Sequence, residues 1–242
     1  MPITAQSPRK IADNTPIIIG AGQYVERLDR RSAPLLTAPM QLAAIACQRA
    51  LQDAGVPAAE VDALAVIRLF SDSAKVWQSP LDGSSNPPES IARRIGATPA
   101  QRIYSSAGGT EPLRLLVELM GAIARGERQV ALLTGAEAIA SQRFAERNGL
   151  AADWREDYDV PFDIPFENRE YRQRFVSQEE INGGLTLPVR SYAVIENMQA
   201  HRLGHDPQQH RNYMARLMAP FSAVAAQNPH AQFPQAYTPH AL

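Results

Sequence analysis

Ser105 and Ser106 are the residues whose type and position come closest to catalytic chemistry. They stand between a short apolar segment and a glycine-rich turn, Ala107-Gly108-Gly109, that leads into a long apolar stretch. Backbone N–H groups at the start of a helix stabilise an anion or an oxyanion. A serine nucleophile also needs a base, but the first histidine of the sequence is His201, and no G-x-S-x-G pattern surrounds the two serines. We therefore favour a tight strand-to-helix turn that needs small residues.

Gly20-Ala21-Gly22 follows three isoleucines and is typical of the turn that binds a dinucleotide in an oxidoreductase. Val25 occupies the position of the third glycine of that pattern, and residues 26–34 are charged and end at a proline. No helix is expected to begin there, so no helix N-terminus faces a pyrophosphate. An ordinary turn at the end of a strand is the favoured interpretation.

Cys47 is the only cysteine and lies in the middle of a predicted helix, on its apolar face. No cationic residue lies on that face at helical spacing, since Arg49 points elsewhere. A free cysteine in such a place behaves as a small hydrophobic residue, and we expect Cys47 to belong to the core.

His201 and His205 are four residues apart, with His210 nearby, and this spacing on one helix face is able to hold a metal ion. Gly204 and Pro207 interrupt the helix there, and no acidic residue completes an H-E-x-x-H pattern. We predict a solvated helix end and no metal site.

Charge and composition exclude several classes of protein. The 242 residues contain 24 Lys and Arg against 25 Asp and Glu, which argues against nucleic acid or an anionic membrane as a partner. No apolar run approaches the length of a bilayer span, and no apolar stretch follows the basic residues of the first 14. A single cysteine is typical of a reducing compartment, which favours a cytoplasmic location.

The elements that must position these residues alternate along the first part of the chain. Strands are predicted at residues 17–19, 63–70, 101–105 and 129–134, and helices at 38–54, 88–95 and 113–124. Helix 113–124 carries only Arg114 and Glu118 as charges, so we expect it to be buried on nearly all sides. Strands separated by helices at this spacing imply parallel pairing within an α/β layer. Residues 142–185 are polar, aromatic and mixed in charge, and they open a largely helical, loop-rich segment with helices predicted at about 189–203 and 207–226.

The segment GGTEPLRLLVELMGAIARGERQVALLTGAEAIAS, residues 108–141, resembles the thiolase superfamily. In that family the nucleophilic cysteine begins a buried helix, which ends at a glycine and leads through a strand to a Gly-x-Glu turn. Gly126, Gly135 and Glu137 match the later landmarks, and the same register places Gly109 at the cysteine position. A glycine has no side chain and forms no acyl-thioester. The resemblance therefore implies that the nucleophile is absent.

The resemblance covers roughly residues 15–237 and extends to sterol-carrier-type thiolases and to bacterial thiolase-like proteins without the cysteine motif. It implies an α/β fold, a thiolase-like half with a layered mixed sheet and a buried helix, plus a mostly helical loop domain. The implied domains are residues 1–141, the α/β domain; 142–228, the helical cover domain; and 229–242, a tail.

Family members are about twice this length, and their second half brings a catalytic histidine and a second cysteine. We expect this half either to be missing from a truncated product or to come from another chain. Thiolases pair through the strand before the nucleophile helix, so residues 101–105 are the predicted edge of a homodimer.

The resemblance implies a thiolase-like acyl-CoA protein of the acetyl-CoA acetyltransferase family, inactive in thiolysis on its own. Coenzyme A or an acyl-CoA is the predicted ligand, with no tightly bound cofactor, and Gly108, Gly109 and Thr110 are its predicted contacts. No catalytic residue is assigned, and Ser105 and Ser106 stay weak candidates. The alternative is a non-catalytic CoA-ester-binding module or a subunit completed by a partner chain.

Overall fold

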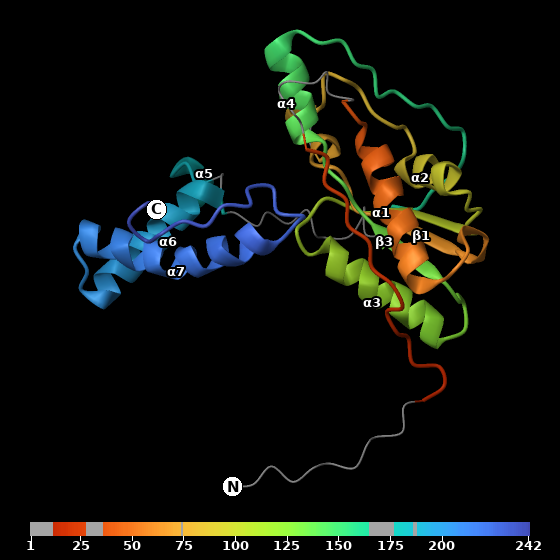
Figure 1. Cartoon of the computed structure of the whole chain (residues 1–242), viewed down its shortest axis with the longest axis horizontal. Helices are drawn as coiled ribbons and strands as arrows, with labels where there is room; N and C mark the ends of the chain where they lie inside the picture. The colour runs from red at the N-terminus through yellow and green to blue at the C-terminus, as the bar shows by residue number, and fades with distance from the viewer. Residues whose placement is uncertain (1–11, 28–35, 74, 165–176, 186–187) are drawn as a thin grey trace, which may run out of the picture. The chain divides into compact units, whose positions relative to one another are not determined.

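The computed structural model describes residues 12–27, 36–73, 75–164, 177–185 and 188–242. The chain divides into two compact units, residues 1–167 and 168–242. Figure 1 shows the sheet and its helices in the first unit and helices alone in the second. The α/β class expected for the first part of the chain is confirmed.

A parallel three-stranded sheet forms the centre of the first unit. Strand β1 (Ala63–Val66) pairs with β2 (Gln101–Tyr104) on one side and with β3 (Ala131–Thr134) on the other. All four residues of β1 are buried, as their uninterrupted apolar sequence predicts for a strand covered on both faces. The predicted strands at 63–70 and 129–134 are confirmed but shorter.

Helices cover the two faces of the sheet. Alternate residues of a strand point to opposite faces, and those of β1 divide accordingly. Leu64 and Val66 pack with helices α1 (Pro39–Ala54) and α2 (Pro87–Ile95), whereas Ala63 and Ala65 pack with helix α3 (Glu111–Ala124). The predicted helices at 38–54 and 88–95 are confirmed, and both end at a glycine in the left-handed conformation, Gly55 and Gly96.

A third apolar cluster extends the first unit beyond residue 141. Helix α4 (Ile139–Asn148) contributes Ala145 to it, and Trp154 packs there while its indole N–H donates to the Leu36 carbonyl at 2.8 Å. Helix α4 opens the part of the chain predicted to be largely helical and rich in loops, but it is not among the helices predicted individually. Short 3-10 turns complete the unit: η1 (Ala58–Glu60), η2 (Phe70–Asp72) and η3 (Lys75–Trp77).

The second unit contains α5 (Gln178–Asn182), α6 (Pro188–Leu203) and α7 (Pro207–Gln227). The two long helices confirm the predicted ones. Asp206 caps α7 by accepting from the backbone of Gln208 and Gln209, and the Gln209 side chain returns a bond to the Asp206 N–H.

The prediction of a buried strand at residues 17–19 is wrong. The three isoleucines are 72, 75 and 50% exposed and form no ladder. Strand β1 is already paired on both sides, and the segment does not pair with the outer edge of β3 either. The segment lies against α1 instead: a Cβ atom at Gly20 would come within 2.5 Å of the Ala50 carbonyl, and one at Gly22 within 2.1 Å of that of Ala46. These glycines allow the backbone of the segment to approach the backbone of α1, and no helix begins within the described residues 23–27 that follow them.

Two further expectations need correction. Helix α3 is covered on one side only, because Leu115 and Leu119 are buried while Leu113 and Val117 are mostly exposed. His210 is not a solvated residue: its side chain is buried, and Nε2 lies 2.8 Å from a carboxylate oxygen of Glu196. Among the described residues, no group of three or more side chains is arranged to hold a metal ion.

Candidate functional site

The carboxyl ends of the three parallel strands meet at one edge of the sheet, where α/β proteins bind their ligands. Ser105 directly follows β2 and is fully buried. Its hydroxyl accepts from the Arg68 backbone N–H at 2.8 Å and donates to the Ser106 carbonyl at 2.9 Å. The hydroxyl thus uses its hydrogen bonds to join the ends of β1 and β2. This geometry agrees with the structural interpretation of Ser105 rather than with a free nucleophile.

The turn before α3 is open to solvent. Gly108, Gly109 and Thr110 are exposed, and Ser106 is half-buried. A Cβ atom at Gly109 would meet nothing within 4 Å, and its φ lies outside the left-handed region. Thr110 occupies the N-cap position of α3, but its side chain makes no capping hydrogen bond. The first backbone N–H groups of the helix are therefore not covered by a capping side chain.

Glu111, the first residue of α3, lies beneath this turn. The residue is only 1% exposed, and its Oε1 accepts from Arg114 Nη1 at 2.9 Å. Oε2 is buried and has no hydrogen-bond partner among the described residues. A Cβ atom at Gly108 would lie 3.5 Å from the Glu111 Cγ, so the carboxylate lies directly beside the exposed turn. A buried acceptor without a partner costs free energy unless a ligand donor reaches it.

A second polar group joins the ends of β1, β2 and β3. Glu137, two residues past the predicted Gly-x-Glu glycine, accepts from the Phe70 N–H at 2.7 Å. Tyr104, at the end of β2, donates its hydroxyl to Asp72 and accepts from the Leu69 N–H at 3.0 Å. Burial raises the pKa of the Glu137 carboxyl, and the negative charge of Asp72 raises it further. The hydrogen bond from the Phe70 N–H partly offsets this rise.

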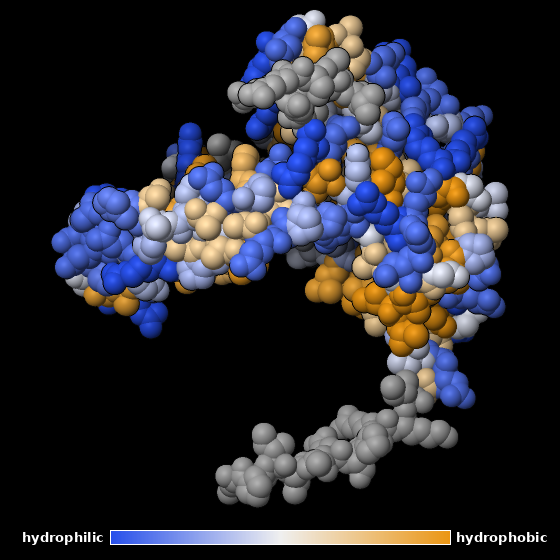
Figure 2. Space-filling view, viewed as in Figure 1, coloured by the Kyte–Doolittle hydropathy of each residue, from blue (hydrophilic) through white to orange (hydrophobic). Residues whose placement is uncertain are grey.

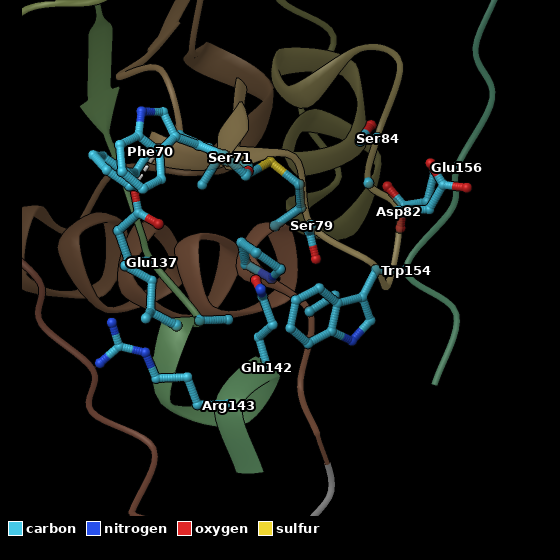
Figure 3. A pocket seen from close by; sticks show the side chains of 18 residues that line it. Phe70, Ser71, Ser79, Asp82, Ser84, Glu137, Gln142, Arg143, Trp154 and Glu156 are labelled. Atoms are coloured by element: carbon cyan, nitrogen blue, oxygen red, sulfur yellow. Dashed lines mark hydrogen bonds between the residues drawn. The ribbon is translucent and has the colours of Figure 1, made fainter. Parts of the chain in front are cut away.

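These strand ends border a cavity of about 170 Å³ (Figure 3). Phe70 and Trp77 form an aromatic wall, with ring centroids 4.9 Å apart, and Trp154 lies on another side. Glu137 and Gln142 supply polar groups from the start of α4 and the loop before it. An aromatic cavity with a few polar groups suits an organic ligand with one polar function. None of Ser105, Ser106, Gly108, Gly109 or Thr110 lines this cavity.

Cys47 lies in the core between α1 and the sheet. Its side chain is 1% exposed, and burial, partly offset by a hydrogen bond with Thr134, raises the pKa of the thiol to about 11. The predicted core role of Cys47 is confirmed.

Comparison with solved structures identifies the fold. A monomeric SCP2-thiolase-like protein of type 1 from Mycobacterium smegmatis is similar with a TM-score of 0.65 and 29% identity, over 96% of this chain and 40% of that chain. The chain has a thiolase-like fold. An acetyl-CoA acetyltransferase from Syntrophomonas wolfei is similar at a TM-score of 0.47 and 16% identity, over 87% of this chain and 47% of that chain. No family model and no curated protein matches the sequence.

The thiolase-like chain spans about two fifths of the length of the Mycobacterium protein. Sequence reasoning located the α3 turn but missed Glu111 and the contact between Glu137 and Phe70. The contact joins residues 67 positions apart, which no local pattern reveals. Glu111 was recognisable as an acidic residue in the first turn of a helix, a position that carboxylates favour.

Proposed function

We propose that this thiolase-like chain is an acyl-CoA protein of the acetyl-CoA acetyltransferase family that binds a CoA thioester at the start of α3 and does not catalyse thiolysis by itself. The observation that carries the proposal is Gly109. It lies at the exposed turn before α3, in open space and in an ordinary backbone conformation. A Cβ atom fits there, so the fold does not require a glycine at this position.

The single thiol of the chain supports the inactive assignment. Acyl transfer through a thioester needs a thiolate, and a cysteine with a raised pKa is mostly protonated at neutral pH. Cys47 is buried and has such a raised pKa. The first histidine, His201, belongs to the other compact unit, and Ser105 is occupied by two backbone hydrogen bonds.

Ligand binding is supported by the donors and acceptors at the same turn. The α3 start presents exposed backbone at Gly108, Gly109 and Thr110, and a helix N-terminus attracts the oxygen of a thioester carbonyl or a phosphate. The unpartnered Oε2 of Glu111 lies buried beside this turn and becomes an acceptor for an N–H or O–H group of the ligand once the turn opens around it. A CoA thioester carries both kinds of group, carbonyl acceptors and amide donors.

The partner is proposed to be a second polypeptide: either another copy that pairs through residues 101–105 or a chain that supplies the C-terminal half. Strand β2 ends the sheet, which suits strand pairing. Its outer edge is partly occupied, however, because the Tyr104 N–H donates to Asp163 and the Arg102 carbonyl accepts from Asp163. A partner strand would have to displace that residue, which favours the completing chain.

We further propose a cellular location and a metabolic role for this chain. Lipid metabolism in the cytoplasm fits an acyl-CoA ligand and the single, buried thiol. In the described part of the chain, no helix combines the length and the apolar character that crossing a membrane requires.

Isothermal titration of the purified chain with CoA and with acetyl-CoA tests the binding. We expect saturable heat with the thioester, weakened at least fivefold by Glu111→Gln, while Glu127→Gln, an exposed carboxylate on the same unit, leaves it unchanged. No heat at millimolar thioester rejects binding. Turnover of acetoacetyl-CoA by the unmodified chain rejects the inactive assignment.

A further inference from the structure

Strand β3 has one open edge. The Thr134 carbonyl accepts from the N–H of Ile67, the residue after β1, at 2.8 Å. The backbone groups of alternate residues in a strand point to opposite edges, so those of Ala131 and Leu133 face away from β1. These two N–H and two C=O groups have no hydrogen-bond partner among the described residues. The outer edge of β3 therefore has donors and acceptors for another strand.

A groove of about 340 Å³ runs along this open edge. Residues 130–134 line it on the side of the sheet, and residues 16–22 line its outer side. Helices α1 and α3 pack on opposite faces of the sheet, and Ala50 of α1 and Leu116 of α3 are among the residues that line the groove. We call this groove the β3 slot. Figure 1 draws the N-terminal segment between α1 and α3, and Figure 2 shows the hydrophobic surface there.

The N-terminal segment forms the outer wall of the β3 slot because hydrogen bonds hold it to a helix at each end. The Asn14 side chain donates to the Ala124 carbonyl of α3 at 3.0 Å, and the Ala21 N–H donates to Asp53 of α1 at 2.9 Å. Between these two bonds, the backbone of Ile17–Ile19 has no hydrogen-bond partner among the described residues. Two extended segments with unpaired backbone groups therefore border the same slot.

The chemistry of the β3 slot suits an extended polypeptide that is apolar on both faces. None of the described residues that line the slot is charged. An acyl chain in the slot would leave the backbone groups of both borders without partners. A strand instead supplies donors and acceptors along both of its edges. Strands covered on both faces, as β1 is, have uninterrupted apolar sequences. The slot is thus complementary to a strand like β1.

We propose that the β3 slot receives such a strand from the completing polypeptide. The three described strands are all placed in the sheet of this chain, and a second copy has the same three in use. The Mycobacterium protein, by contrast, has three fifths of its length outside the part that matches this chain. The inserted strand pairs with Ala131 and Leu133 along one edge and with residues 17–19 along the other. This inference rests on the completing chain of the proposed function and states where that chain binds.

Amide hydrogen exchange of the purified full chain, followed by NMR, tests the open edge. We expect the N–H groups of Ala131 and Leu133 to exchange at least tenfold faster than that of Leu132, which faces β1. Equal protection of the three amides would show that the edge is already covered, for example by residues 17–19, and overturns the proposal. No CoA ester is present, so this test and the thioester titration fail independently.

A synthetic peptide of alternating valine and isoleucine between flanking lysines tests the occupant. Its control has the same side chains on an N-methylated backbone, which donates no hydrogen bonds. We expect the first peptide, but not the control, to slow exchange at Ala131 and Leu133 at least tenfold.

Two neighbouring positions of α3 provide matched variants for the same measurement. Leu116→Lys puts a charge into the β3 slot and is expected to abolish the protection by the peptide. Val117→Lys, at an exposed position that does not line the slot, should leave it unchanged. Protection of the wild-type chain by both peptides or by neither overturns the proposal, as does equal protection of the two variants.

Discussion

The backbone N–H of Phe70 donates to Oε1 of Glu137 at 2.7 Å and so joins the loop after β1 to the loop after β3. These loops border the same cavity, and the bond fixes the distance between them. The carboxylate carries out this role in a partly buried place beside Asp72, which raises its pKa. Glu137 is therefore both a structural acceptor and a group that titrates above its ordinary range.

The titration of Glu137 predicts a pH effect. A carboxyl whose pKa is raised by folding contributes stability below its unfolded pKa and loses it as pH rises through the raised, folded value. We expect the free energy of unfolding to fall, by less than about 1 kcal/mol, as pH rises above 4.5. Glu137→Gln removes this decline. Urea unfolding of both proteins between pH 4 and pH 7 measures it, and parallel pH profiles would contradict the assignment.

Glu89 is expected to change the stability in the opposite direction as the pH rises. The residue is 6% exposed and accepts from Arg93 at 2.7 Å and from Arg102 at 2.6 Å. Burial alone would raise the pKa of this carboxyl, but the two hydrogen bonds and the charges of the arginines lower it. Its stabilising contribution is present above the unfolded pKa and is lost as pH falls through the lower, folded value.

Glu89→Gln is expected to cost about 2–3 kcal/mol at pH 7, because it leaves the partly buried Arg102 without its charged partner. Chemical denaturation at pH 7 measures this loss. Glu127→Gln, which breaks an exposed ion pair with Arg125, is the control and should leave the stability essentially unchanged. Equal effects of the two substitutions would show that burial of Glu89 is unimportant.

Gly22→Ala tests the contact between the N-terminal segment and α1. A Cβ atom there would lie 2.1 Å from the Ala46 carbonyl, so the segment must move away from the helix. We expect a loss of about 1–3 kcal/mol, seen as a lower Tm. Gly83→Ala, at an ordinary φ with open space, should leave the Tm unchanged within about 1 °C. An unchanged Tm for Gly22→Ala would mean that this contact is not formed.

Gly109→Cys restores a thiol at the position that the resemblance assigns to the nucleophile. The open space predicts no loss of stability, and the nearby helix start lowers a thiol pKa. We expect the introduced thiol to react with iodoacetamide at pH 7 at least tenfold faster than a Gly83→Cys thiol. Mass spectrometry of tryptic peptides separates the sites, including the buried Cys47. Equal rates would show that α3 provides no activation.

The helices that begin or end with strong local signals were predictable from the sequence. Gly55 and Gly96 end α1 and α2, and Asp206 begins α7, because cap chemistry depends on neighbours along the chain. Helix α4 was missed because its N-cap, Ala138, offers no capping group and only Ser141 and Ala145 of its residues are buried. A helix with weak apolar periodicity and no capping side chain cannot be recognised from the sequence.

The strand prediction at Ile17–Ile19 failed for a different reason. An apolar run shows that a segment seeks burial, but a strand also needs a partner edge, and that is a property of the whole sheet. The α3 turn was predicted through glycines, whereas Glu111 and the cavity were not. Their contacts depend on how the strand ends and helix starts come together in three dimensions.

Asp163 occupies the middle of the outer edge of β2 through two backbone hydrogen bonds, at 2.9 Å to Tyr104 and 2.8 Å to Arg102. A single residue thereby blocks the groups that another sheet would need for edge-to-edge growth. The carboxylate of Asp163 at this edge also repels the Asp163 carboxylate on the β2 edge of another copy. The bridge thus leaves the outer edge of β2 with fewer free backbone groups for pairing with another strand.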